Sequence, residues 1–145
     1  KHMNRSDIRV KALALIRRGA QILVHEVYEK DASQRLIGYR TLGGHVEFGE
    51  RAADTLVREI KEELNADVRI LGLAGMSENI FIWGGKPGHE VIFVYEAEFV
   101  DQSFYERDTM LAVNDQGGNF NVLWIDPRHT PNNLPLFPDG LLDML

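Results

Sequence analysis

The sequence contains no cysteine among its 145 residues. This absence excludes disulfide bonds, iron–sulfur clusters, cysteine-ligated zinc and thiol nucleophiles. Any metal ion that the chain holds must therefore bind to oxygen or imidazole ligands. The sequence also lacks a run of roughly 18 uncharged apolar residues, the minimum for a membrane-spanning helix, so we expect no membrane span.

Basic residues are in the minority, with 16 Lys and Arg against 22 Asp and Glu and a net charge of −6 at pH 7. No basic tail is present, which argues against nucleic acid as the main partner and disfavours messenger-RNA decapping. The start of the chain shows no secretory signal, and residues 1–3 resemble a cloning remnant. We therefore expect one domain over residues 4–145 and a cytoplasmic location.

The charges are unevenly distributed along the chain. Residues 1–42 carry nine basic and four acidic side chains, whereas residues 43–67 carry three basic and seven acidic side chains. A basic and an acidic block side by side can hold anions and cations together. Such an uneven distribution of charge also arises by chance, so by itself it does not identify a ligand.

The hydrophobic pattern predicts an α+β domain, mostly strands around one strong helix. Alternating apolar residues predict a β-hairpin formed by residues 10–16 and 21–27. Apolar residues at helical spacing predict a helix over residues 51–64. Four prolines between residues 127 and 138 exclude a long helix before residues 139–145. Further strand-like segments are residues 38–42, 68–73, 80–83, 91–100 and 120–125.

The predicted helix carries an unusual group of acidic residues. Glu59, Glu62 and Glu63 fall along one edge of its apolar stripe. Like charges at this spacing cost about 0.2–0.5 kcal/mol per pair, and the helix dipole disfavours anions in the last turn by about 0.3–1 kcal/mol. A divalent cation such as Mg²⁺ or Mn²⁺ would remove this penalty, because both prefer oxygen ligands. The alternative is an ordinary solvated acidic face.

The segment before this helix, residues 42–50, contains three glycines. Glycine lets the backbone approach a ligand closely, although a Gly-Gly pair more often marks a simple tight turn. The segment is not a Walker A loop, since no Gly-Lys-Ser/Thr follows. Taken alone, Glu50 fits a carboxylate at a helix start, and Arg58 fits an exposed helical arginine.

The spacing of these residues resembles a known signature. Gly44, five residues, Glu50, seven residues and then Arg58-Glu59-Ile60-Lys61-Glu62-Glu63 are similar to the signature of the Nudix hydrolases. The resemblance covers residues 44–66. It implies an α+β fold described as a Nudix-like α/β/α sandwich with a mixed central sheet.

The sequence departs from that signature at its end. Asn65 stands where the family has glycine, and Ala66 where it has a larger apolar residue. Asparagine is the second choice after glycine for the left-handed residue that ends a helix. We therefore expect Asn65 to preserve the geometry of the helix end.

The resemblance implies specific metal ligands. Glu59, Glu62 and Glu63 would bind Mg²⁺ or Mn²⁺ through their carboxylates. Gly43 would be a further ligand through its backbone carbonyl.

It also implies supporting roles nearby. Arg58 and Glu50 would orient the metal-binding glutamates. Family members often add an acid from a later loop, and here Glu106 or Asp115 would serve. Most acids in such loops merely cap turns.

The activity that the resemblance implies is the metal-dependent hydrolysis of a phosphoanhydride bond. The substrate would be a nucleoside diphosphate linked to another moiety, and water would attack phosphorus with one of the carboxylates taking its proton. The alternative is a catalytically silent Nudix-like domain that binds or senses a nucleotide. Such a domain has no reason to keep three mutually repelling glutamates, so we favour the enzyme.

Residues outside the signature could select the small nucleotide-type substrate. Arg40 could reach a phosphate, and His45 could donate a hydrogen bond to a sugar or phosphate. Tyr39, Phe81 and Trp83 could stack on a base, although an aromatic residue of this kind more often packs in the core. The apolar runs likewise fit either the core or a homodimer interface.

Overall fold

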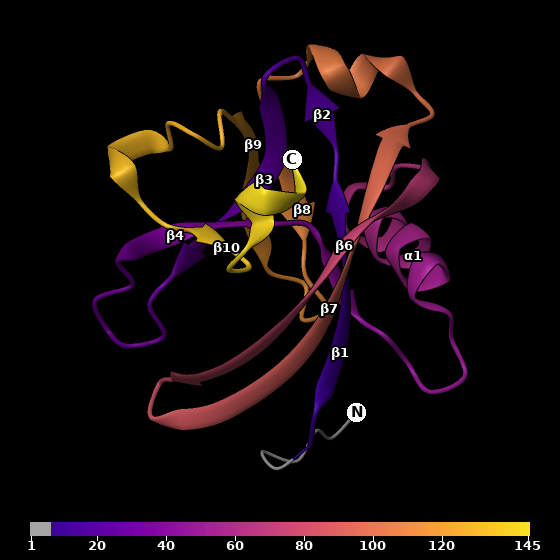
Figure 1. Ribbon diagram of the computed structural model, residues 1–145. Helices are drawn as coiled ribbons and strands as arrows, with labels where there is room; N and C mark the ends of the chain where they lie inside the picture. The colour runs from indigo at the N-terminus through magenta and orange to yellow at the C-terminus, as the bar shows by residue number, and fades with distance from the viewer. Residues whose placement is uncertain (1–6) are drawn as a thin grey trace.

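The computed structural model describes residues 7–145, so the expectation for residues 1–3 lies outside the described residues. The described residues form ten strands and one α-helix. The long β6–β7 hairpin projects away from the remainder (Figure 1). The strands are β1 (Arg9–Leu15), β2 (Arg17–Arg18), β3 (Gln21–Tyr28), β4 (Leu36–Thr41), β5 (Gly43–His45), β6 (Val68–Trp83), β7 (Lys86–Phe99), β8 (Thr109–Val113), β9 (Asn119–Ile125) and β10 (Leu136–Phe137). The helices are α1 (Ala52–Leu64) and the short 3₁₀ segments η1 (Gln102–Glu106), η2 (Pro131–Asn133) and η3 (Leu141–Met144).

The strands form two sheets. In the first, with the order β5-β1-β7-β6, β1 runs parallel to β7 and antiparallel to β5. In the second, the order is β10-β4-β3-β9-β8, and β2 pairs with β3 outside this path. The expected α+β class and the mixed sheet are therefore confirmed.

Strand β1 separates two parts of the core. Successive side chains of a strand point to opposite faces, so Ala12 and Ala14 pack with α1 while Leu13 and Leu15 pack with the C-terminal segment. Leu56 and Ile60 of α1 are fully buried against the first part. Burying a side chain of this size contributes about 1.5–3 kcal/mol, so the apolar stripe fixes which face of α1 remains open to solvent.

The predicted hairpin of residues 10–16 and 21–27 is wrong. Strands β1 and β3 lie in different sheets, and only the two-residue β2 turns back on β3. β1 instead lies between β5 and β7, with four of its seven residues buried. A strand covered on both faces carries a nearly continuous apolar run, which resembles one arm of a hairpin in sequence.

Two further expectations need correction. Residues 68–73 and 80–83 belong to one 16-residue strand, β6, whose register shifts between Ile70 and Gly72 and again between Leu73 and Gly75. Each such bulge interrupts the alternation from which a strand is predicted. The helix expected in residues 139–145 is reduced to the single 3₁₀ segment η3.

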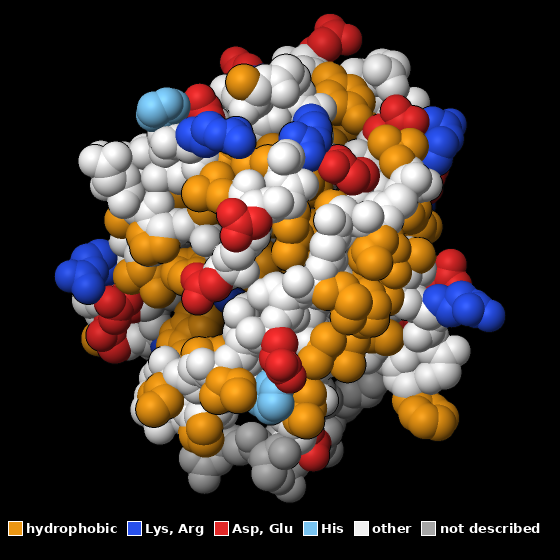
Figure 2. All heavy atoms as spheres, viewed as in Figure 1, with side chains coloured by type: hydrophobic (Ala, Val, Ile, Leu, Met, Phe, Trp, Pro, Cys, Tyr) orange, Lys and Arg blue, Asp and Glu red, His pale blue; other side chains and the backbone are white. Residues whose placement is uncertain are grey.

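Figure 2 shows hydrophobic side chains gathered on the face across which β6 and β7 run. The large exposed apolar residues of β6 are Leu71, Leu73, Met76, Ile80 and Ile82. None of the helices in the described part of the chain has the length and apolar character that crossing a bilayer requires.

Helix α1 ends as the sequence predicts. Asn65 adopts the left-handed conformation, with φ 53° and ψ 39°, and its backbone N–H donates to the carbonyl of Lys61. Asparagine tolerates this conformation better than most residues. The replacement of the family's glycine therefore leaves the end of the helix intact.

Candidate active site

Strand β5 brings a glycine against the acidic edge of α1. A Cβ atom at Gly44 would overlap the carboxylate of Glu59. At Gly43, a Cβ would overlap the backbone of Ala12 in the neighbouring strand β1. Both glycines are therefore required by close packing, and Gly44 in particular leaves room for a carboxylate beside the backbone.

Arg58 connects the start of α1 to its acidic edge. Its guanidinium donates to both carboxylate oxygens of Glu50, at 2.8 Å from Nε and 3.0 Å from Nη2. Its Nη1 donates to Glu59 and to Glu62, each at 3.1 Å. The planar guanidinium thus holds three carboxylates in a fixed arrangement, which a lysine could not do.

Glu50 is itself held from several directions. Thr55 donates its hydroxyl to Glu50 at 2.6 Å, and the backbone N–H of Glu47 donates at 3.3 Å. The hydrogen bonds from Arg58 and then from Thr55 lower the pKa of Glu50 to about 2. Glu50 is therefore ionised at neutral pH and acts only as a hydrogen-bond acceptor.

The acidic group includes a residue from a distant part of the chain. Carboxylate oxygens of Glu59, Glu62 and Asp115 all lie within 4.8 Å of one another. Asp115 belongs to the exposed turn between β8 and β9. Of the two loop acids that the sequence offered, the structure brings Asp115 to the group, whereas Glu106 lies exposed in η1 and outside it.

Glu63, the third glutamate of α1, has its carboxyl group in surroundings that disfavour a negative charge. Its Oε1 atom is buried and has no hydrogen-bond partner. Burial, followed by the nearby charges of Glu59 and Asp115, raises the pKa of Glu63 to about 9. Burial also raises the pKa of Glu59. A group of carboxylates that resists ionisation in this way is the environment that a bound cation stabilises.

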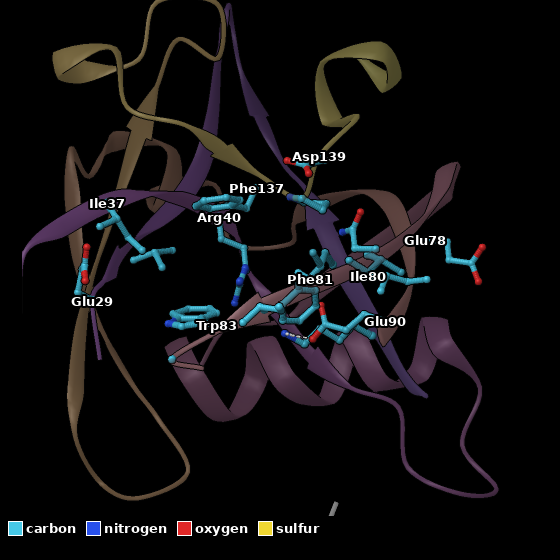
Figure 3. Close-up of a pocket in the computed structure, with 18 residues that line it drawn as sticks. Glu29, Ile37, Arg40, Glu78, Ile80, Phe81, Trp83, Glu90, Phe137 and Asp139 are labelled. Atoms are coloured by element: carbon cyan, nitrogen blue, oxygen red, sulfur yellow. Dashed lines mark ion pairs between the residues drawn. The ribbon is translucent and has the colours of Figure 1, made fainter. Parts of the chain in front are cut away.

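A cavity of about 580 Å³ lies on the other side of β1 and is shown in Figure 3. Three of the predicted substrate contacts, Arg40, Phe81 and Trp83, line it. The guanidinium carbon of Arg40 lies 5.6 Å from the centre of the Trp83 ring. The structure therefore brings these three residues together from β4 and β6.

The other two predicted contacts lie elsewhere. Tyr39 is 3% exposed and packs in the core, which leaves no open ring face for a base and removes it from the candidates. His45 is half-buried, its Nδ1 has no partner, and its carbonyl accepts from Arg58 at 3.4 Å. Burial and the charge of Lys11 lower the pKa of His45, so its imidazole is neutral at pH 7.

The model of the NUDIX domain matches residues 7–109. The chain belongs to the Nudix family. The match extends well beyond the signature, from β1 to the first residue of β8, and includes α1, the whole first sheet and strands β2, β3 and β4 of the second. Glu50, Arg58 and the three glutamates of α1 are thus the Nudix signature residues of this chain.

Individual Nudix relatives are more distant. The MutT4 protein of Mycobacterium tuberculosis is 28% identical over 91 residues, which cover 63% of this chain and 34% of MutT4. The chain therefore spans about a third of the length of this curated relative.

Solved structures show the shared fold. A MutT Nudix hydrolase from Burkholderia pseudomallei superposes with a TM-score of 0.67 at 23% identity, covering 96% of this chain and 97% of that one. A Nudix-family hydrolase from Clostridium perfringens gives 0.61 at 17% identity, covering 98% and 95%. A UDP-X diphosphatase gives 0.63 at 14% identity, covering 96% and 61%.

Sequence reasoning missed one feature beside the Nudix signature. Lys11 and Glu90 form an ion pair of 3.2 Å in the wall of the cavity, with side chains only 13% and 10% exposed. A lysine within the apolar run of β1 was the available signal, because a buried charge needs a partner.

Proposed function

We propose that this chain is a pyrophosphohydrolase that cleaves a phosphoanhydride bond with the help of a divalent cation. Its substrate class is a nucleoside diphosphate linked to another moiety. The observation that carries this proposal is the convergence of Glu59, Glu62 and Asp115 beside Gly44. These carboxylates lie within 4.8 Å of one another, an arrangement that a bound cation stabilises.

The residues present fit Mg²⁺ or Mn²⁺. Both ions prefer carboxylate oxygens, and Glu63 offers a buried oxygen that has no hydrogen-bond partner. We propose Glu59, Glu62, Glu63 and Asp115 as ligands, together with the carbonyl of Gly43. When bound, the ion lowers the pKa of water and neutralises charge on the leaving phosphate.

The remaining roles belong to the protein's own side chains. Arg58 and Glu50 hold Glu59 and Glu62 in place through the hydrogen bonds described above. One carboxylate of the acidic group takes the proton of the attacking water.

The part of the substrate that does not react would occupy the cavity. Phe81 and Trp83 supply aromatic surface there, and Arg40 supplies a positive charge. His45, in strand β5, lies one residue from Gly44 and is neutral, so it can donate or accept a hydrogen bond.

A substrate panel tests this function. Nucleoside di- and triphosphates, nucleotide sugars and dinucleotides are incubated with Mg²⁺ or Mn²⁺, and released phosphate or monophosphate is measured. We expect turnover that disappears in EDTA. Glu62→Gln and Glu63→Gln should each lower it by about a hundredfold or more while the fold persists.

A matched control accompanies these variants. Glu98→Gln also removes one carboxylate, but Glu98 pairs with Arg69 on the surface, so turnover should not change. Near-normal turnover of both α1 variants at saturating Mg²⁺ would contradict the proposal. Nucleotide binding without any hydrolysis would instead identify a silent binding domain.

A further inference from the structure

Two cations lie against the indole ring of Trp83, a residue of the cavity lining. The Nζ atom of Lys30 lies 5.2 Å from the centre of the indole ring, and the guanidinium carbon of Arg40 lies 5.6 Å from it. Trp83 is the last residue of β6, Arg40 belongs to β4, and Lys30 lies in the loop between β3 and β4. Lys30 and Arg40 thus both lie beside one indole ring, although they come from separate segments.

Neither of these cations has an acidic partner. Among residues 7–145, no ion pair or hydrogen bond is formed by the guanidinium of Arg40 or by the ammonium of Lys30. Three glutamates line the cavity, but each already has a basic partner. The pairs are Glu90 with Lys11 at 3.2 Å, Glu29 with Arg35 at 2.8 Å and Glu78 with His89 at 3.0 Å. Glu90 attracts the guanidinium of Arg40 but is paired with Lys11, so the described residues offer Arg40 no carboxylate of its own.

The position of Arg40 makes this charge costly. Its side chain is largely buried, and that burial lowers the pKa of the guanidinium. Removing an unpaired charge from water is unfavourable unless an opposite charge arrives. The remaining acid of the lining, Asp139, lies at the opposite end of the cavity from Trp83 (Figure 3). An anionic group of a ligand is the natural complement of Arg40 and Lys30.

This location is separate from the acidic group of α1. Lys11 and Leu13 of β1 line the cavity, whereas Ala12 between them packs on the side of α1. Because neighbouring side chains of a strand point to opposite faces, the two sites lie on opposite sides of β1. An anion held near Trp83 is therefore a different group from a diphosphate held near α1.

We propose that Arg40, Lys30 and Trp83 form an anion subsite for a phosphate group of the substrate that is remote from the bond to be cleaved. This inference rests on the proposed function. It narrows the substrate class to nucleoside diphosphate derivatives that carry at least one further phosphate. Arg40 supplies a planar fork for phosphate oxygens, and Lys30 supplies a second positive charge beside the same indole ring.

The first test uses inorganic pyrophosphate in EDTA, with calorimetric detection. Without metal, the carboxylates of α1 repel this anion, so its binding reports on the cationic subsite. We expect binding that weakens about tenfold in Arg40→Gln and in Lys30→Gln. Lys30 is exposed, so its replacement does not threaten the fold.

Two control variants make the result specific. Arg128→Gln removes the same charge from an exposed position outside the cavity, and Glu62→Gln alters the acidic group. Neither should weaken metal-free pyrophosphate binding. Equal affinity of Lys30→Gln, Arg40→Gln and Arg128→Gln for pyrophosphate would overturn the subsite.

The second test compares two ligands that differ by a single phosphate, NAD⁺ and NADP⁺, in the presence of Mg²⁺. We expect kcat/KM to favour the phosphorylated ligand by about tenfold, and Lys30→Gln to bring the ratio close to one. Equal hydrolysis of both ligands, with pyrophosphate binding unaffected by either substitution, overturns the subsite and leaves the proposed function standing. If no member of the substrate panel is hydrolysed while pyrophosphate binding still depends on Arg40, the proposed function is overturned and the anion subsite stands.

Discussion

Arg58 binds Glu50 through two parallel hydrogen bonds, of 2.8 Å from Nε and 3.0 Å from Nη2. The same guanidinium donates to Glu59 and Glu62 through Nη1. Glu50 precedes α1 and the other two acids lie on it, so this one side chain fixes the acidic edge relative to the loop that joins β5 to α1. The geometry of the site depends on a planar donor at this position.

Arg58→Lys tests this dependence. A lysine keeps the charge but offers a single ammonium in place of the planar fork, so Glu59 and Glu62 lose their fixed orientation. We expect kcat to fall by about tenfold or more, with a much smaller change in melting temperature. Arg69→Lys, at a surface ion pair with Glu98, is the control and should keep full activity. Unchanged kcat in Arg58→Lys would show that the fork is not needed.

Gly44→Ala tests the close approach of β5 to α1. The added Cβ would overlap the Glu59 carboxylate, which must then move away from Glu62 and Asp115. We expect turnover to fall by about a hundredfold, because a small displacement of a catalytic group has a large effect on rate. Gly72→Ala is the matched control, since nothing lies within 4 Å of its Cβ position. Equal turnover of the two variants would refute this interpretation.

Glu63→Gln should stabilise the metal-free protein while it abolishes activity. The folded-state pKa of Glu63, about 9, lies above the ordinary value of 4.5. The carboxyl group therefore favours the folded state below about pH 4.5 and loses that contribution as the pH rises toward 9. A neutral amide avoids this loss. In EDTA at pH 7, calorimetry should show a melting temperature higher by about 5 °C; a decrease would contradict the assignment.

The acid stability of the protein should depend on Glu50. Its folded-state pKa, about 2, lies below the ordinary value of 4.5, so its stabilising contribution is complete above pH 4.5 and is lost as the pH falls toward 2. Glu50→Gln removes this titration. Urea unfolding measured between about pH 2 and 6 should therefore give a shallower pH dependence in the variant than in the wild type. Parallel curves would show that the ion pair does not stabilise the fold.

Residues close together in sequence were the predictable part of the site. The spacing of Glu50, Arg58 and the three glutamates follows from one loop and one helix, so local periodicity is sufficient to bring them together. Asn65 ends α1 in the left-handed conformation for the same local reason. The order of the strands in the sheets could not be predicted in this way. The parallel pairing of β1 with β7 joins residues about 80 positions apart, and no local pattern encodes it.

Contacts between segments far apart in the sequence also determine which of the other candidate residues reach the site. The sequence does not distinguish Asp115 from Glu106 as the loop acid. In the structure, the β8–β9 turn brings Asp115 to α1. Tyr39 and Trp83 are both aromatic residues in strands, yet one packs in the core and the other lines the cavity. Burial of an individual aromatic side chain depends on the neighbouring elements, which the sequence pattern of one strand does not reveal.

The most direct measurement is the binding of Mn²⁺ to the metal-free protein, followed by electron paramagnetic resonance. The wild type should bind at least one ion per chain. Glu59→Gln combined with Glu62→Gln should weaken that binding by about tenfold or more, and Asp115→Asn should weaken it as well, whereas Glu106→Gln should not. Mn²⁺ affinity that is the same in the wild type and in the Glu59, Glu62 and Asp115 variants would contradict the account.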